Sequence, residues 1–159
     1  MAHIVVADDS PTVRRVLRGW LESAGHTVHE ASDGEHTLQA LRAAREPTVI
    51  LLDYLMPGMT GDQVLQRALD QGFVPPRYVY VIVSGLTADF PPTFTDLLRS
   101  LSIQILPKPF DQHTLLSAVA FLASLLPAPD LPASTPTPSA PKPSAPTPSA
   151  PKRRFPWRR

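Results

Sequence analysis

The chain has 159 residues, with 20 prolines, no cysteine and a formal net charge of +1. The lack of cysteine excludes a disulfide framework and thiolate chemistry, and no stretch approaches the roughly 20 apolar residues of a membrane-spanning helix. Because Met1 to Ser10 also lacks the pattern of a secretion signal, we expect a cytoplasmic protein without a transmembrane segment.

The composition changes at Pro127. From there to Arg159, 11 of 33 residues are proline and the net charge is +5, which leaves −4 on residues 1–126. We therefore predict a globular domain over residues 1–126 and a disordered Pro/Ala/Ser/Thr-rich tail over residues 127–159. Since an acidic domain binds nucleic acid poorly, any affinity for polyanions is expected in the tail.

The first predicted strand is His3–Ala7, whose apolar residues do not alternate with polar ones, as is typical of a strand covered on both faces. Ser10 and Pro11 mark the start of a helix, and Gly25 supplies the left-handed residue that ends it. The apolar stripe of this helix consists of Val13, Val16, Leu17, Trp20 and Leu21.

The same alternation continues along the chain. Further strands are expected at His26–Glu30, Thr48–Leu52, Tyr78–Val83 and Ile103–Leu106. Helices are expected after Asp33, after a capping box of Thr60 and Gln63, over Thr93–Leu101, and after Asp111. Pro91 and Pro92 make the fourth helix short. Five strands alternating with helices predict a parallel sheet wrapped on both faces.

Polar side chains directly follow four of the predicted strands. Asp8 and Asp9 come after the first strand, Asp53 after the third, Ser84 after the fourth and Lys108 after the fifth. Ligands of open α/β sheets bind outside the carboxyl ends of the strands, so these side chains are expected to converge. Taken singly, each also has an ordinary explanation as a helix cap, a turn residue or an exposed cation.

Three carboxylates at one edge repel one another unless a cation lies among them. Mg²⁺ suits such a site, because it prefers hard oxygen ligands and keeps waters beside one or two carboxylates. With the metal and Lys108 offsetting negative charge, Asp53 can act as a carboxylate nucleophile toward a phosphoryl group. The residues therefore favour Mg²⁺ as the cofactor and phosphoryl transfer as the chemistry.

Four motifs carry a family resemblance: VADDSPTVRRVL, ILLDYLMPGMTG, Ser84-Gly85 and Lys108-Pro109-Phe110. Together they resemble the receiver domain of two-component response regulators, over residues 3 to about 126. The resemblance implies an α/β, flavodoxin-like, doubly wound sheet of five parallel strands in the order 2-1-3-4-5, with five helices. It also implies a single-domain, chemotaxis-type switch whose only chemistry is its own phosphorylation and dephosphorylation.

The resemblance also implies a role for each motif residue. Asp53 becomes the acceptor of a phosphoryl group from a histidine kinase or a phosphotransfer protein. Ser84 and Lys108 would each hold a phosphoryl oxygen, and the Lys108–Pro109 peptide bond would be cis. Phosphorylation would then change the binding of a downstream target protein through the surface of the fourth helix, fifth strand and fifth helix, where two copies also could pair.

The metal ligands follow from the same resemblance. Asp9 and Asp53 would bind Mg²⁺ directly, the backbone carbonyl of Leu55 would add another ligand, and Asp8 would act largely through water.

Three positions depart from the family pattern. Ile105 stands where receivers commonly carry an aromatic switch residue, so we expect signalling to rely on Ser84, on residues 85–89 and on the short fourth helix. Leu55 and Leu86 are apolar where polar groups often guide water. We expect slow self-dephosphorylation from these two leucines; a mere packing role for them is an equal alternative.

The tail contains TPSAPK twice, at Thr137–Lys142 and Thr147–Lys152, and should be an extended polyproline-like spacer. It ends in KRRFPWRR, Lys152 to Arg159, where two aromatic residues lie among five cations. Three interpretations stay open for this segment: a solubilising extension, an anchor for anionic membrane or nucleic acid, and a peptide docked by a protein partner.

Two other functions compete with the phosphorylation switch. A Mg²⁺-dependent aspartyl phosphohydrolase of the haloacid dehalogenase type would need a second aspartate two residues after its nucleophile, which Asp8-Asp9-Ser10 does not offer. A phosphorylation-independent scaffold or adaptor is the other alternative, because the aromatic switch residue is missing.

Overall fold

The computed structural model describes residues 1–85 and 90–128, in which strands and helices alternate five times. The strands are β1 (His3–Ala7), β2 (Thr27–Ala31), β3 (Thr48–Asp53), β4 (Tyr78–Ser84) and β5 (Gln104–Pro107). The helices are α1 (Pro11–Ser23), α2 (Gly34–Ala43), α3 (Gly61–Asp70), α4 (Pro92–Ser100) and α5 (Gln112–Ser124).

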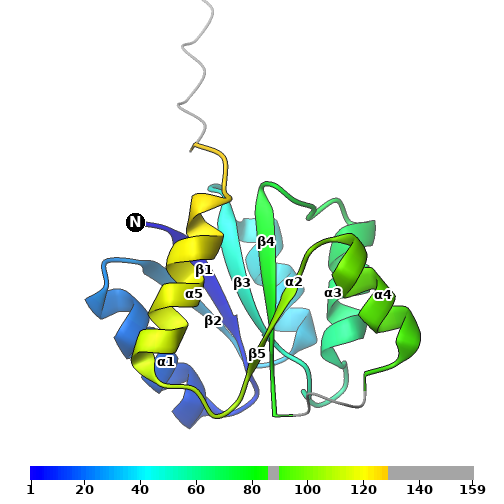
Figure 1. Ribbon diagram of the computed structural model, residues 1–159, viewed down its shortest axis with the longest axis horizontal. Helices are drawn as coiled ribbons and strands as arrows, with labels where there is room; N and C mark the ends of the chain where they lie inside the picture. Colours follow the sequence, from blue (N-terminus) through cyan, green and yellow to red (C-terminus); the bar gives the residue numbers. More distant parts are fainter. Residues whose placement is uncertain (86–89, 129–159) are drawn as a thin grey trace, which may run out of the picture.

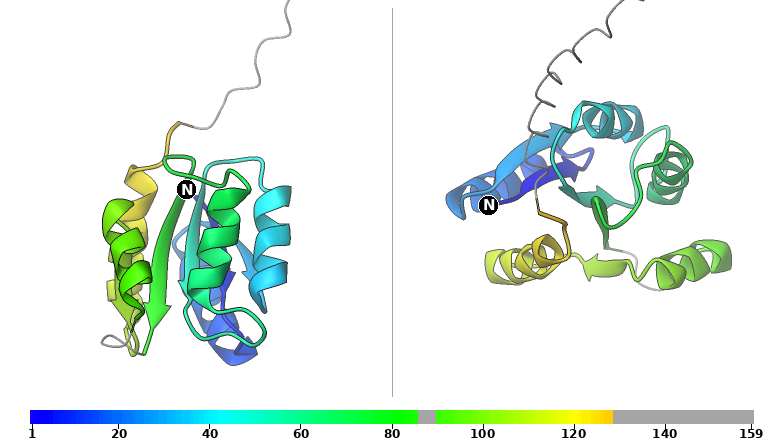
Figure 2. Two further views of the ribbon diagram at one scale, coloured as in Figure 1. Left: turned by 90° about the vertical axis from the view of Figure 1, so that its right-hand side faces the viewer. Right: turned by 90° about the horizontal axis from the view of Figure 1, so that it is seen from above.

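All five strands lie parallel in one sheet, in the order β2-β1-β3-β4-β5 (Figure 1). Helices α1 and α5 cover one face, and α2, α3 and α4 cover the other (Figure 2). The predicted fold, a doubly wound flavodoxin-like sheet in the order 2-1-3-4-5, is confirmed. Its consequence for function is that all the strands end at the same edge.

The core consists of two apolar layers, one on each face of the sheet. Successive strand residues contribute to opposite layers, as the period of two requires: Ile4 packs with Leu17 and Leu115, whereas Val5 packs with Leu38 and Val64. Strands β3 and β4 are buried along their whole length, which explains their unbroken apolar sequence.

The starts of α1, α2, α3 and α5 are where the sequence predicts them. Ser10, Asp33 and Asp111 accept hydrogen bonds from the N–H groups of Val13, His36 and Thr114. The N–H of Thr60 donates to Gln63 Oε1 at 3.1 Å, which completes the capping box of α3. Gly25 has a φ of 84°, in the left-handed region, just beyond the end of α1.

The differences from the predicted elements are small and have local causes. Strands β2 and β5 are each shifted by one residue, and α4 begins at Pro92, where a missing N–H costs nothing. Val16 belongs to the predicted apolar stripe of α1 but is 42% exposed, because the helix faces the sheet through Leu17 and Leu21.

Several predictions concern residues that the structure does not describe. The tail from residue 129 onward, with its repeats and the segment Lys152 to Arg159, lies outside the described residues, as do Leu86 and the rest of residues 86–89. The domain boundary at residue 126 stays a prediction.

Candidate functional site

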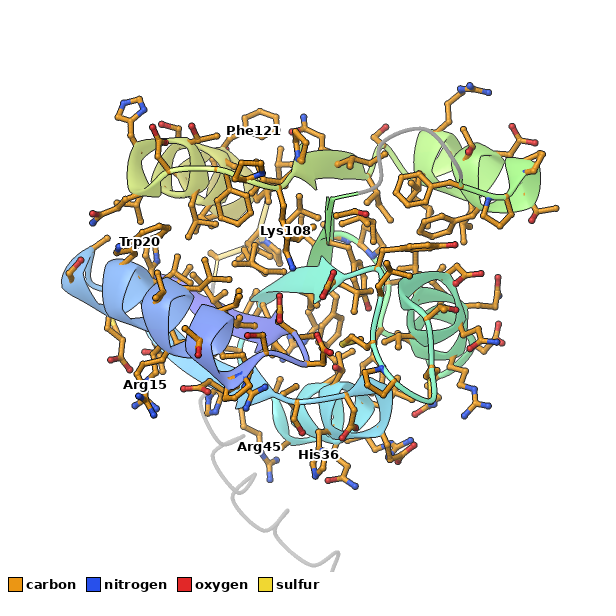
Figure 3. The ribbon with its side chains drawn as sticks, turned by 90° about the horizontal axis from the view of Figure 1, so that it is seen from below. Arg15, Trp20, His36, Arg45, Lys108 and Phe121 are labelled. Carbon is orange, nitrogen blue, oxygen red and sulfur yellow. The ribbon has the colours of Figure 1, made fainter. Side chains whose placement is uncertain are left out.

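The five polar residues predicted to converge lie at the carboxyl edge of the sheet. Asp53 and Ser84 are the last residues of β3 and β4, Asp8 directly follows β1, and Lys108 directly follows β5. In the sheet register Ala7 pairs with Leu52, Asp53 with Val83, and Ser84 with Pro107. The register therefore places the ends of four strands side by side, with Lys108 near the centre of this edge (Figure 3).

Three carboxylates meet at this edge. One oxygen from each of Asp8, Asp9 and Asp53 can be chosen such that all three lie within 4.8 Å of one another. Asp8 and Asp53 are buried, whereas Asp9 is exposed. Within the described residues, this is the cluster of acidic side chains whose geometry suits a metal ion.

Lys108 places its ammonium group between the two buried carboxylates. Its Nζ donates to Asp8 Oδ2 at 2.7 Å and lies 3.3 Å from Asp53 Oδ2. The backbone fixes its position as well, since the N–H of Lys108 donates to the carbonyl of Ser84 at 2.9 Å. The Lys108–Pro109 peptide bond is cis, as the resemblance implied.

These contacts shift the pKa values of Asp53 and Lys108. Burial raises the pKa of Asp53, the charge of Lys108 lowers it, the charge of Asp8 raises it, and the net change is upward. Burial alone would lower the pKa of Lys108, but the hydrogen bond to Asp8 and the charge of Asp53 outweigh that effect and raise it. The lysine therefore stays protonated at neutral pH.

Asp8 is held at both of its carboxylate oxygens. Oδ1 accepts the N–H of Ser10 at 2.8 Å, and Oδ2 accepts from Lys108. The backbone N–H of Asp8 also donates to the carbonyl of Ala31 at 3.1 Å, which ties the segment to β2. Asp8 is thus fixed by its surroundings before any ligand arrives.

Ser84 and Leu55 complete the predicted set. Ser84 is buried at the end of β4, beside Asp53 on the neighbouring strand. Leu55 is the second residue after β3; its N–H donates to Asp53 Oδ1 at 3.4 Å, and the residue is 52% exposed. The roles of both residues stay predictions.

Arg14, Gly61 and Tyr54 contribute to the site but were not predicted. Nη1 of Arg14 donates to the carbonyls of Asp8 and Asp9. A side chain at Gly61 would lie 2.9 Å from the carbonyl oxygen of Asp53. The available signal was their place inside the two longest motifs, VADDSPTVRRVL and ILLDYLMPGMTG.

Tyr54, the residue directly after Asp53, links the site to α4. Its ring stacks on Phe94 with centroids 5.4 Å apart and meets the edge of Phe90 at 4.6 Å. Ile105, by contrast, is a partly exposed aliphatic residue of β5. An aromatic contact between the site and α4 is therefore made by the residue that directly follows β3, and not from β5, where Ile105 lies.

No helix in residues 1–85 and 90–128 is long and apolar enough to cross a membrane.

The comparisons with known proteins agree with the fold. The family described as the response regulator receiver domain matches residues 4–120. Protein PilH of Pseudomonas aeruginosa is 34% identical over 122 residues, which cover 75% of this chain and 95% of PilH. The structure of chemotaxis response regulator CheY4 of Vibrio cholerae aligns with a TM-score of 0.66 at 28% identity, over 77% of this chain and 98% of CheY4.

A longer relative contains the same domain. Protein-glutamate methylesterase/protein-glutamine glutaminase 3 of Hahella chejuensis is 31% identical over 107 residues, 67% of this chain but only 30% of that protein. The similarity therefore concerns a part of the methylesterase and does not transfer its activity. The family match over residues 4–120 and the similarity along nearly all of PilH lead to one conclusion: the chain belongs to the response regulator receiver domain family.

Proposed function

We propose that Asp53 accepts a phosphoryl group from a histidine kinase or a phosphotransfer protein, and that the resulting change in charge switches partner binding. The observation that carries this proposal is the position of Lys108 Nζ, 2.7 Å from Asp8 and 3.3 Å from Asp53 at the carboxyl edge of the sheet. A buried carboxylate next to a protonated amine suits a group that must receive a phosphoryl group with several negative oxygens.

The transfer step is a substitution at phosphorus. An oxygen of Asp53 attacks the phosphorus, the P–N bond of the donor's phosphohistidine breaks, and its electron pair passes to the imidazole. The product is an acyl phosphate on Asp53. Lys108 is already within reach of a group on this carboxylate, and the hydroxyl of Ser84 comes from the neighbouring strand.

The carboxylate cluster fits Mg²⁺ by the chemistry of its donors. Asp8, Asp9 and Asp53 offer oxygens only, and together with Lys108 they leave a net charge of −2 in a partly buried place. These three side chains and the carbonyl of Leu55 would hold the ion. A bound Mg²⁺ would offset the charge on the phosphoryl oxygens.

A groove beside the site suits the approach of the phosphodonor. It has a volume of about 290 Å³ and runs between α1 and the segment after β5. Its lining is mainly apolar and includes Val13, Trp20 and Phe110 together with Lys108. A donor protein bound there would present its phosphohistidine within reach of Asp53.

The switch would act through α4. Phosphorylation adds about 1.5 to 2 negative charges at neutral pH next to Tyr54, whose ring packs against Phe94 of α4. A change at Asp53 can therefore reach the surface of α4, β5 and α5, where a downstream target would bind one state better.

The test is phosphorylation by a small donor. Incubation with acetyl phosphate and Mg²⁺ should place one hydroxylamine-labile phosphoryl group on the wild-type chain and none on Asp53→Asn. Asp70→Asn, which removes an exposed acid at the end of α3, is the matched control and should be phosphorylated like the wild type. Equal labelling of Asp53→Asn, or none of the wild type, would contradict the proposal.

A phosphorylation-independent scaffold is the second candidate, and Ile105 favours it because an aliphatic side chain lacks the ring and hydroxyl of the usual switch residue. One variant distinguishes the two functions in cells. Asp53→Asn would abolish signalling by a phosphorylation switch but would leave the activity of a scaffold unchanged. Sustained release of phosphate from small phosphomonoesters would instead indicate a phosphohydrolase.

A further inference from the structure

Asp9 differs from the other two carboxylates of the cluster in how it is held. Asp8 and Asp53 are buried and contact Lys108. The side chain of Asp9 is exposed, and among the described residues it has no hydrogen bond or ion pair. Its position beside Asp8 and Asp53 therefore depends on its backbone.

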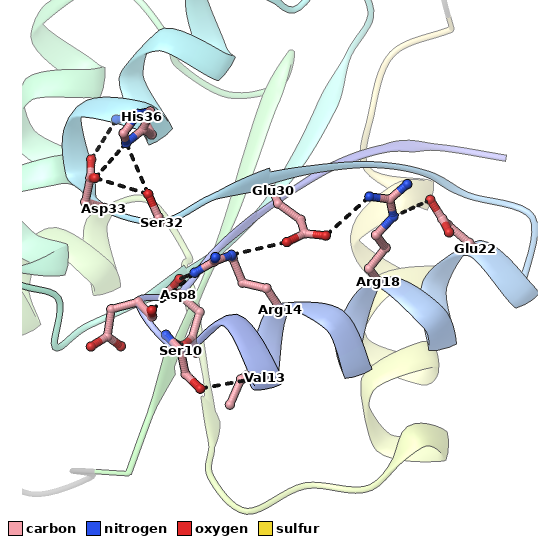
Figure 4. Close-up of polar contacts among 11 residues, drawn as sticks. Asp8, Ser10, Val13, Arg14, Arg18, Glu22, Glu30, Ser32, Asp33 and His36 are labelled. Atoms are coloured by element: carbon pink, nitrogen blue, oxygen red, sulfur yellow. Dashed lines mark hydrogen bonds and ion pairs between the residues drawn. The ribbon is translucent and has the colours of Figure 1, made fainter.

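Arg14 contacts that backbone from the first turn of α1. Its Nη1 donates to the carbonyl of Asp8 at 2.7 Å and to the carbonyl of Asp9 at 3.2 Å (Figure 4). Its Nε donates to Glu30 Oε2 of β2 at 3.2 Å. The guanidinium thus joins the segment that carries both aspartates to the neighbouring strand.

Glu30, the carboxylate that Arg14 contacts, is also held by a second arginine. Glu30 Oε1 accepts from Arg18 Nη1 at 3.3 Å, and Arg18 Nε donates to Glu22 at 2.8 Å. Arg14 is only 14% exposed, so its contacts are better shielded from water than those of Arg18, which is 50% exposed. A rigid planar fork that reaches two carbonyls and one carboxylate suits arginine and not lysine.

Two effects of Arg14 on a bound cation have opposite signs. Its positive charge close to the carboxylates repels Mg²⁺, so charge alone would make binding tighter when Arg14 is removed. Its hydrogen bonds hold the Asp8-Asp9 segment in place, so removing them would make binding weaker. Groups that orient metal ligands typically change metal affinity by about tenfold or more when they are lost.

We propose that Arg14 is a positioning residue, which keeps Asp9 facing the metal position through the carbonyls of Asp8 and Asp9. This inference rests on the proposed Mg²⁺ site. Its signature is that removing a positive charge at position 14 weakens the binding of a positive ion, because the ordering of Asp9 outweighs the repulsion.

The experiment is a calorimetric titration of the full chain with Mg²⁺. Arg14→Met should raise the Kd for Mg²⁺ by about tenfold. Arg15→Met is the matched control, because Arg15 is the exposed neighbour on the same helix and has no side-chain hydrogen bond or ion pair among the described residues. Its Kd should stay the same or fall slightly. Arg14→Lys keeps the charge without the planar guanidinium and should bind Mg²⁺ at least as weakly as Arg14→Met.

Unfolding in urea without metal separates positioning from a purely structural role. If Arg14→Met lowers the free energy of unfolding but binds Mg²⁺ as tightly as Arg15→Met, the inference is wrong. Should Arg14→Met not fold, Glu30→Gln, which keeps Arg14 but removes the charge of its anchor, is expected to weaken Mg²⁺ binding more than Glu22→Gln, which removes the same charge from a residue that contacts Arg18. A wild-type chain that binds no Mg²⁺ would instead overturn the metal site of the proposed function.

Discussion

Lys108 carries the positive charge that separates two buried carboxylates. Its ammonium lies within 3.3 Å of both Asp8 and Asp53, while those side chains are only 3% and 8% exposed. The charge that is proposed to attract a phosphoryl group therefore also reduces a repulsion that the fold would otherwise have to sustain. At this residue, stability and the proposed function depend on the same contacts.

Replacing this lysine should destabilise the metal-free protein. We expect Lys108→Met to lower the free energy of unfolding by about 2 kcal/mol, because two neighbouring buried carboxylates lose their cation. Mg²⁺ should restore more stability to this variant than to the wild type, since it supplies the missing positive charge. Urea unfolding with and without Mg²⁺ measures both effects.

Arg99→Met is the matched control for this prediction. It removes a cation from an ion pair with Asp96 in which both side chains are about three-quarters exposed. Its effect should stay within about 0.5 kcal/mol and should not depend on Mg²⁺. A Lys108→Met variant that is as stable as Arg99→Met would contradict the role assigned to the lysine charge.

At the scale of the elements, the segment between β3 and α3 is held by a close approach of backbones. The N–H of Gly61 donates to the carbonyl of Tyr54 at 2.7 Å, and a Cβ at position 61 would lie 2.9 Å from the carbonyl oxygen of Asp53. Because the neighbouring atoms are backbone, they cannot rotate away. The start of α3 therefore fixes the end of the strand that carries Asp53.

Gly61→Ala should accordingly lower the free energy of unfolding by about 1 to 3 kcal/mol, the usual cost of overpacking. Gly19→Ala makes the same chemical change inside α1, where nothing lies within 4 Å of the added methyl group. It should stabilise the protein by up to about 1 kcal/mol through helix propensity. Equal stabilities for the two variants in urea unfolding would show that the segment after β3 can shift freely.

Local sequence signals predicted the elements well because each depends on near neighbours. Ser10, Asp33 and Asp111 cap helices through N–H groups three residues ahead, and the unbroken apolar runs of β3 and β4 reflect burial on both faces. The convergence of Asp8, Asp9, Asp53 and Lys108 could be predicted because parallel strands end at one edge. The chemical roles of these residues stay predictions.

Contacts between elements could not be predicted in the same way. Arg14 reads as a solvent-facing residue of an amphipathic helix, yet it reaches back to the carbonyls of Asp8 and Asp9. The stacking of Tyr54 on Phe94 joins residues 40 positions apart along the chain. Such contacts depend on how the layers pack, which a local pattern does not encode.

At the scale of the whole molecule, the charge is divided between two unlike parts. Residues 1–126 carry −4 and contain every member of the two apolar clusters, whereas residues 127–159 carry +5. All the side chains proposed to hold Mg²⁺ or the phosphoryl group also lie before residue 126. We therefore expect folding and phosphorylation to depend on the first part.

A chain shortened to residues 1–128 should therefore fold, bind Mg²⁺ and accept a phosphoryl group from acetyl phosphate as the full chain does. It should also lose any retention on heparin, because the net charge changes from +1 to −4 and the clustered cations of KRRFPWRR are removed. Full-chain retention should weaken steeply as salt rises, since charge drives it. If the shortened chain unfolds at a lower urea concentration or loses Mg²⁺ binding, the tail contributes to the domain itself. If the shortened chain is retained on heparin as strongly as the full chain, the polyanion contact lies within residues 1–128.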